Sequence, residues 1–358
     1  MELYKNFAEK AKYFTCETIT SIEQLHSVLK TFQGKPFVFR GVKNAAFMNY
    51  SSAQVNTQAL YSQEQFNSSI IEAIDLVKHS KRLIRMLKKR SKDETDSEVL
   101  ALLQHYGFGT PFLDYSYKFN YGVFFALDGM DESYTNDETD INNYCSIYYF
   151  NSDDPYHKPF QKVQEYSVES LEECDATGKV EYGRRYKGLS DSTITSYKNF
   201  PYKEMCEDFS KGGLTIASRS GGVIKIDSKQ TGLHTTYDIS NERDDIQRGL
   251  FKYNPSSSKP YEVAAVDWIF DMYERNFCLN IHKSLKDILV QEFLAPYNIS
   301  RETVYPNTKY NKKVIRELLK LPMDGSLRPK SPQNMSAKTL KKYNTLYEKR
   351  LSKYSRSK

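Results

Sequence analysis

The sequence predicts an α+β fold in which a small mixed or antiparallel sheet packs with several helices. Short runs rich in β-branched and aromatic residues are typical of strands, and they occur at 36–41, 145–151, 221–227 and 248–253. Longer segments carry apolar residues at helical spacing, chiefly 21–32, 61–90, 96–106, 263–273, 285–294 and 314–319. Helices and strands of such uneven length and order indicate the α+β class.

The helix predicted over 21–32 has clear signals at both ends. Ser21 and Gln24 stand at capping-box spacing, and Gly34 follows the last apolar residue. This helix leads into the strand at 36–41, which ends in Arg40 and Gly41 and so places a guanidinium where the chain leaves the sheet.

The helix predicted over 61–90 ends in a basic run between Lys78 and Lys92. The run is typical of a solvated helix end where cations suit the helix dipole, and it is also compatible with binding of phosphate or RNA. The next helix starts near Asp96 or Ser97, either of which is able to cap it, and Gly107 is suited to end it in the left-handed conformation.

The stretch from Gln104 to Ser116 holds the most informative pattern, QHYGFGTPFLDYS. A helix delivers His105 to a tight turn rich in glycine, and the turn then releases Asp114. We expect Asp114 to be buried and paired with an arginine or with backbone N–H groups. A helix end with a buried structural histidine is the alternative interpretation of this spacing.

The remaining sequence predicts a buried helix over 120–130, a polar insertion at about 152–215 and a basic amphipathic C-terminal helix. We expect an extension at 1–14, one domain at 15–322 and a linker with a basic tail at 323–358. Residues 328–358 hold ten basic residues and one acidic residue, a net of +9 in a chain of net +6, so residues 1–327 carry −3. Polyanion contacts are therefore expected in the tail.

Other features limit the classes of function. No apolar run reaches the length of a membrane span and the N-terminus lacks a signal-peptide pattern, so we expect a cytoplasmic protein. The five cysteines are scattered without a Cys-x-x-Cys pair, which indicates reduced thiols. The six histidines never fall at i, i+4 spacing, so no metal site is expected. The phosphate-loop motif and the nucleophile-elbow motif are also absent.

Several ordered motifs resemble the FRG domain family, which is named for a Phe-Arg-Gly triplet at a strand end. The matching residues are Phe39-Arg40-Gly41, Gln104-His105-Tyr106-Gly107, Thr110, Leu113-Asp114, Phe124-Phe125-Ala126, Asn241, Arg243, Gln247, Gly249 and Phe251. Two positions depart from the family pattern, with Gly109 in place of proline and Pro111 in place of arginine. A ligand contact made by that arginine elsewhere in the family is lost here or taken over by another group.

The strand-end arginine is also similar to the first motif of ADP-ribosyltransferases, in which an arginine holds NAD. This similarity covers few residues: Thr215–Ser220 matches the serine motif poorly, and the nearest carboxylates for the catalytic glutamate are Glu242 and Glu262. The resemblance implies an intracellular effector of toxin or phage-defence type that binds a phosphate-bearing nucleotide such as NAD and transfers ADP-ribose.

Under that reading each candidate residue has a role. Arg40 holds the pyrophosphate, His105 hydrogen-bonds the ribose or base, and Tyr106 stacks on the ligand. His105 and Glu242 are the candidate catalytic groups, and the further ligand-binding candidates are Thr110, Asp114, Arg243 and Gln247. We expect Arg40, His105 and Arg243 to converge on one cleft.

Two alternatives remain open at this point. The arginines and Asp114 suit a buried ion-pair network that only fixes the fold. The chain also suits a non-catalytic interaction module that binds RNA or a partner protein through its basic helix and tail.

Overall fold

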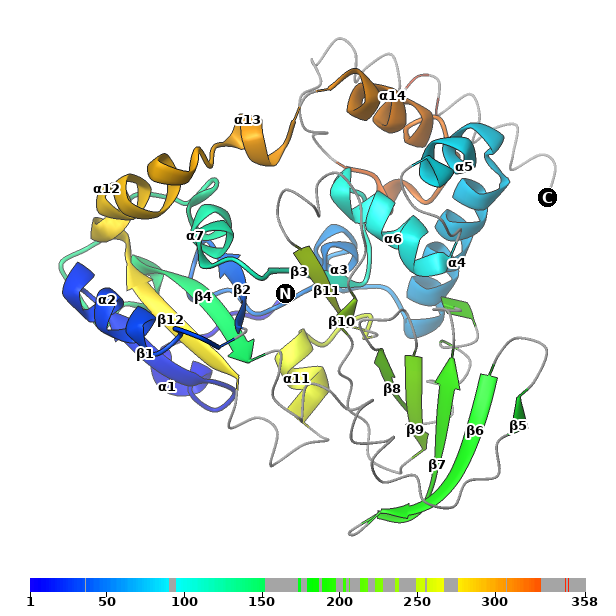
Figure 1. The fold of residues 1–358 in the computed structure, drawn as a ribbon, viewed down its shortest axis with the longest axis horizontal. Helices are drawn as coiled ribbons and strands as arrows, with labels where there is room; N and C mark the ends of the chain where they lie inside the picture. The colour runs from blue at the N-terminus through cyan, green and yellow to red at the C-terminus, as the bar shows by residue number, and fades with distance from the viewer. Residues whose placement is uncertain are drawn as a thin grey trace.

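The computed structural model describes residues 1–35, 37–89, 95–151, 249–254, 256–266, 276–306 and 308–329, the strands between 173 and 237, and Tyr202, Lys203, Cys206, Thr345 and Tyr347. A seven-stranded mixed sheet forms its centre (Figure 1). In spatial order the strands are β1 (Thr15–Ile19), β12 (Phe277–His282), β4 (Tyr144–Asn151), β2 (Phe37–Val42), β3 (Phe112–Ser116), β11 (Gly249–Tyr253) and β10 (Thr236–Tyr237). Only β1 and β12 pair in parallel; every other pair is antiparallel. The predicted α+β class is confirmed.

Apolar layers cover both faces of this sheet. One face packs against α2 (Ile22–Lys30), α7 (Phe119–Leu127) and α12 (Lys286–Leu289) through Leu25, Val28, Phe124, Leu289 and their neighbours. The N-terminal segment with α1 (Phe7–Lys10) lies on the other face, where Tyr4 and Phe14 pack beside Tyr148 and Cys278. The capping box predicted at Ser21 and Gln24 is present at the start of α2.

A group of helices gathers beside the end of the sheet that carries β3 and β11 (Figure 1). They are α3 (Ser52–Asn56), α4 (Gln63–His79), α5 (Lys81–Lys88), α6 (Asp96–His105) and α14 (Lys309–Leu318). The single helix predicted over 61–90 is thus two helices. Ser80 adopts an extended conformation (ψ 94°) that ends α4, and its hydroxyl accepts a hydrogen bond from the Leu83 N–H to start α5.

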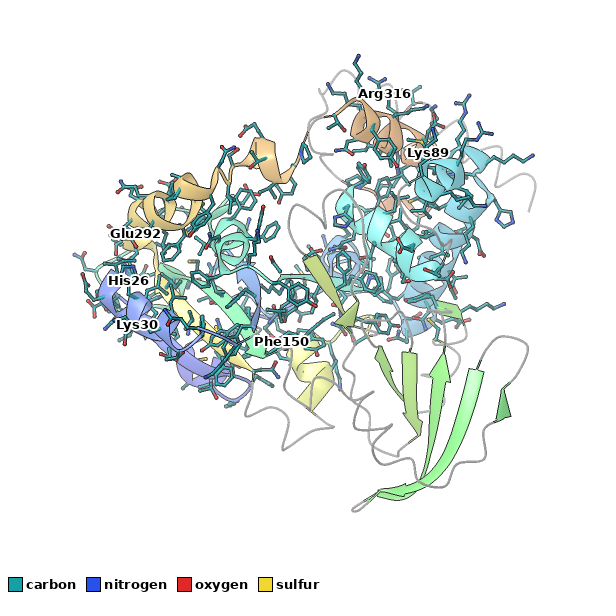
Figure 2. The ribbon with its side chains drawn as sticks, in the orientation of Figure 1. His26, Lys30, Lys89, Phe150, Glu292 and Arg316 are labelled. Atoms are coloured by element: carbon teal, nitrogen blue, oxygen red, sulfur yellow. The ribbon has the colours of Figure 1, made fainter. Side chains whose placement is uncertain are left out.

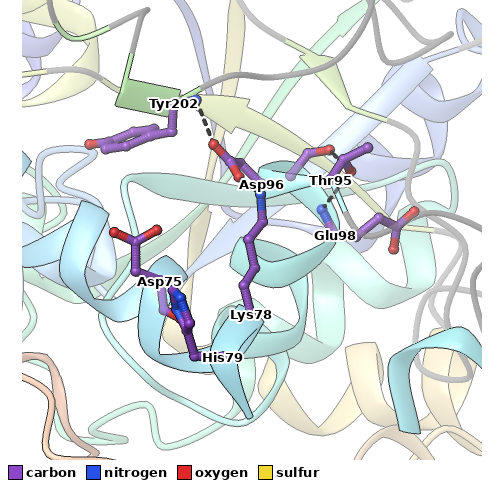
Figure 3. Close-up of polar contacts among 8 residues, drawn as sticks. Asp75, Lys78, His79, Thr95, Asp96, Glu98 and Tyr202 are labelled. Carbon is purple, nitrogen blue, oxygen red and sulfur yellow. Dashed lines mark hydrogen bonds and ion pairs between the residues drawn. The ribbon is translucent and has the colours of Figure 1, made fainter. Parts of the chain in front are cut away.

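The N-terminus of α6 differs in detail from the prediction. Thr95, not Asp96 or Ser97, is the capping residue, because its hydroxyl accepts the Glu98 N–H. The Asp96 carboxylate instead accepts the Tyr202 N–H at 2.8 Å and pairs with Lys78 (Figure 3). Asp96 therefore ties the segment at Tyr202 to α4 and α6.

The region between 173 and 227 holds a second, antiparallel sheet that the sequence pattern did not reveal. Its spatial order is β5 (Glu173–Cys174), β6 (Lys179–Tyr186), β7 (Leu189–Tyr197), β9 (Val223–Asp227) and β8 (Gly213–Ala217). The strand predicted at 221–227 is β9. Most of the sheet falls within the predicted polar insertion, whose strands lack a clear apolar alternation.

The remaining elements are short. They are a 3-10 turn at Ile141–Asn143, α11 (Tyr261–Val266), a 3-10 turn at Lys283–Leu285, a π-helical turn at Val290–Leu294, 3-10 turns at Ala295–Tyr297 and Gly325–Leu327, and α13 (Arg301–Val304). The helix predicted over 285–294 thus changes from α to π geometry at Val290. In the described part of the chain, no helix is both long enough and apolar enough to cross a membrane.

The start of the predicted linker and tail lies within the fold. Met323 and Leu327 are buried among the helices α4, α6 and α14. Further along, the Tyr347 hydroxyl donates to the Met323 carbonyl at 2.9 Å, and the Arg328 guanidinium lies 3.8 Å from the centre of the Tyr347 ring. The packed core therefore extends at least to Leu327, and Tyr347 docks on it.

Candidate functional site

The Phe39-Arg40-Gly41 triplet on β2 has a direct physical explanation. Side chains alternate across a strand, so Phe39 and Gly41 face α7 while Arg40 points to the opposite side of the sheet. A β-carbon on Gly41 would lie 2.0 Å from the Gly122 carbonyl oxygen and 2.4 Å from the Ala126 nitrogen. The glycine therefore allows the backbone of α7 to lie directly on the strand.

Arg40 is half-buried, and neutral acceptors hold its guanidinium. Nε donates to Asn49 Oδ1 at 3.1 Å, and Nη1 donates to the backbone carbonyl of Asp114 at 3.1 Å. Among the described residues no carboxylate forms an ion pair with Arg40. In the part of the chain that the structure describes, the guanidinium is thus fixed in direction without a neutralising carboxylate, which suits capture of an anion.

Asn49 connects Arg40 to a buried carboxylate. Its backbone N–H donates to both carboxylate oxygens of Glu262, at 3.0 and 3.2 Å, and the Tyr4 hydroxyl donates to the same carboxylate. Glu262 is fully buried, and this burial raises its pKa. Glu262 therefore acts through Asn49 as a positioning group for Arg40.

Gln104 organises the turn predicted as the centre of the site. Its amide nitrogen donates to Asp114 Oδ2 at 2.7 Å, while its carbonyl oxygen accepts the hydroxyls of Ser52, at 2.8 Å, and Thr110. Asp114 is half-buried, and among the described residues its carboxylate is paired with this amide instead of an arginine or a backbone N–H. Thr110 is fully buried and engaged with Gln104, so its role in this structure is to hold the turn.

His105 and Tyr106 close α6 in different environments. The half-buried His105 ring lies 5.5 Å from the ring of Phe251, measured between centres. Tyr106 is buried in the helical core, where its hydroxyl donates to Asn311 Oδ1 at 2.7 Å, so it joins α6 to α14. Gly107 has the left-handed conformation that the sequence predicted, with φ +78°.

The structure unites part of the predicted set. Asp114 connects two of these groups. Its backbone carbonyl accepts from the Arg40 guanidinium, and its carboxylate accepts from Gln104, the neighbour of His105 in the chain. Glu242, Arg243 and Gln247 lie outside the described residues, so their convergence on this region stays a prediction. Within the described ranges, no group of three His, Cys, Asp or Glu side chains is arranged to hold a metal ion.

Lys252 on β11 is a buried residue that the sequence analysis missed. Its Nζ lies 3.6 Å from the ring centre of Phe150 and 5.0 and 5.3 Å from those of Tyr115 and Tyr261. It forms no hydrogen bond with the described part of the chain, and burial lowers its pKa well below the ordinary value. A signal existed in the sequence, since this lysine interrupts the aromatic strand Phe251–Tyr253.

We predict that Lys252→Met stabilises the protein by at least about 1 kcal/mol at pH 7. A desolvated cation–π contact contributes about 2 kcal/mol, less than the several kcal/mol needed to desolvate an ammonium group. Because the folded-state pKa is depressed, the unfolded chain binds more protons between that pKa and about 10.4, and wild-type stability rises with pH across this window.

Denaturant titrations of both proteins at several pH values check this prediction. The difference between Lys252→Met and wild type should shrink as the pH approaches about 10. A variant less stable than wild type at every pH would mean that the aromatic cage favours the ammonium form.

Comparison with known proteins agrees with the motif. Residues 35–135 match the FRG domain profile, a span that includes β2, α6, the Gln104 turn, β3 and α7. No curated protein and no solved structure gave a match. The chain carries an FRG domain over residues 35–135, as its Phe39-Arg40-Gly41 motif predicted.

Proposed function

We propose that the FRG domain binds a phosphate-bearing nucleotide such as NAD through Arg40 and transfers its ADP-ribose, as part of a cytoplasmic effector of toxin or phage-defence type. One observation carries the proposal: the guanidinium of Arg40 is half-buried and oriented by Asn49 and the Asp114 carbonyl without a carboxylate partner in the described residues. Arginine with free N–H donors binds phosphate by parallel hydrogen bonds.

The proposed reaction breaks the bond between the nicotinamide nitrogen and ribose C1′. Nicotinamide leaves with the bonding electrons, and a nucleophile of the target forms the new bond at C1′ and releases its proton to solvent. His105 would hydrogen-bond the ribose or the base, and Arg243 with Gln247 would complete the ligand contacts. Glu242 is the proposed catalytic carboxylate, since Glu262 is fully buried and already bonded to Tyr4 and Asn49.

The central experiment is incubation of the full chain with NAD and measurement of released nicotinamide, with and without cell extract as a source of targets. We expect Arg40→Ala to lower the rate roughly 100-fold, because two charge-assisted hydrogen bonds to phosphate are worth about 3 kcal/mol. Arg301→Ala is the matched control, since Arg301 is exposed and pairs with Asp128 on the surface.

The folded state of each variant is checked by circular dichroism, and Arg40→Lys replaces Arg40→Ala if the latter fails to fold. The native chain at a nucleotide concentration of 100 Kd should gain about 2.7 kcal/mol of stability. The absence of both nicotinamide release and a thermal shift with NAD would reject the proposal. That result would favour the alternative, a non-catalytic module that binds RNA or a partner protein through its basic helix and tail.

A further inference from the structure

Two neighbouring helices carry a dense set of exposed cations. They are α5 with the residue that follows it, and α14. We call these side chains the basic face; they are Lys81, Arg82, Arg85, Lys88, Lys89, Lys309, Lys312, Lys313 and Arg316. The sequence pattern indicated the basic run around α5 and the basic tail, and the fold adds the cations of α14.

Packing explains why all the charge points outward. Leu83, Met86 and Leu87 of α5 are buried in the same core as Val314, Ile315 and Leu318 of α14, and the Tyr310 hydroxyl donates to the Met86 carbonyl at 2.9 Å. Because the apolar sides of both helices are buried in this core, their charged sides face solvent. Figure 2 shows Arg316 at the top of the view on α14 and Lys89 just below it, near α5.

One acidic side chain, Glu317, lies within these two helices. Its carboxylate accepts from Lys320 at 2.7 Å and from Arg82 at 3.4 Å. Burial opposes ionisation of Glu317, but these two cations outweigh it and lower its pKa. In the described ranges no carboxylate pairs with the other cations Lys81, Arg85, Lys89, Lys309, Lys312, Lys313 and Arg316.

The distribution of charge along the chain is strongly uneven. Residues 81–89 and 309–320 hold ten basic residues and one acidic residue, a net of +9. Residues 328–358 add another +9, so the rest of a chain with net charge +6 carries −12. Concentrating like charges on one surface costs self-repulsion, which a bound polyanion would relieve.

Two described residues near the C-terminus, Arg328 and Tyr347, lie beside α14. Arg328 donates to the carbonyl of Leu319, the residue that ends α14, at 3.0 Å, and its guanidinium stacks on Tyr347. Tyr347 and Arg328 therefore lie next to the C-terminal end of α14.

We propose that the basic face of α5 and α14 binds the phosphodiester backbone of a nucleic acid. A membrane surface is the weaker candidate, because interfacial helices insert large apolar side chains beside their cations. Among the described residues, none of the large exposed hydrophobic side chains lies on α5 or α14. This surface is separate from Arg40, so the inference does not depend on the proposed nucleotide activity.

Fluorescence anisotropy with labelled 20-nucleotide single-stranded RNA, single-stranded DNA and duplex DNA tests the proposal on the full chain. We expect affinity to fall steeply with salt. Replacing Arg85, Lys89, Lys312 and Arg316 by glutamine should weaken binding at least about tenfold. It should also reduce the slope of log K against log salt by about 0.7 for each lost phosphate contact on single strands, and about 0.9 on duplex.

The matched control replaces Lys5, Lys12, Lys30 and Lys35 by glutamine, four exposed lysines within or next to α1 and α2. It removes the same net charge and should retain affinity within about twofold. Equal losses of affinity in both variants would show that only net charge matters and would contradict a specific role of the basic face. Absence of binding by the wild type at ~50 mM salt would reject the proposal. Binding to anionic vesicles but to none of the three nucleic acids would also overturn the proposal. The three probes then show which nucleic acid is preferred.

Discussion

Gly41→Ala should destabilise the protein by about 3 kcal/mol or more, the upper range for overpacking a closely packed site. The added methyl group would meet backbone atoms of α7 at 2.0 and 2.4 Å, and backbone cannot move aside as a flexible side chain does. Separation of β2 from α7 would open the apolar layer around Phe39 and Phe124. Chemical denaturation followed by circular dichroism measures the loss.

Gly129→Ala is the matched control for this substitution. Gly129 has φ +71° and open space around the position of a new β-carbon, so the cost there is conformational, about 1–2 kcal/mol. Equal losses at the two sites would show that contact with α7 does not determine the requirement for glycine in the triplet.

Lys10→Met should cost about 3 kcal/mol or more, because it removes three buried hydrogen bonds from a charged donor. The fully buried Nζ of Lys10 donates to the Ala45 carbonyl at 3.0 Å, to Ser146 Oγ at 2.6 Å and to Asn280 Oδ1 at 2.8 Å. Its charge also lies 4.8 Å from the ring centre of Tyr148. This one side chain attaches the N-terminal segment to β4 and β12.

Lys12→Met is the corresponding control. Lys12 is two residues away and exposed, so the same substitution there should change the free energy of unfolding by less than about 0.5 kcal/mol. Comparable melting of the two variants would mean that the hydrogen bonds of Lys10 add nothing to stability. Thermal and denaturant unfolding of both variants decides the matter.

The local parts of the fold were readable from the sequence. The capping box of Ser21, the strand around Arg40 and the left-handed Gly107 each depend on residues within a few positions of one another. The break between α4 and α5 was not predicted because the helical spacing of apolar residues continues past Ser80. That spacing does not indicate the extended backbone of Ser80, which ends α4.

The buried polar contacts could not be predicted in the same way. Asn49 and Glu262 are 213 residues apart, and Lys10 reaches Asn280 across 270 residues. Such pairs arise only when the strands have taken their order, which one sequence does not specify. For the same reason the sequence predicted an arginine or a backbone N–H as the partner of Asp114, whereas the side-chain amide of Gln104 donates to its carboxylate.

The function of Arg40 is tested most directly by a crystal structure of the chain with a non-hydrolysable NAD analogue. The account predicts phosphate oxygens within about 3 Å of the Arg40 guanidinium nitrogens, with Asn49 still in contact with that side chain. An analogue bound elsewhere, with Arg40 held only by Asn49 and the Asp114 carbonyl, would contradict it and leave the arginine as a fold determinant.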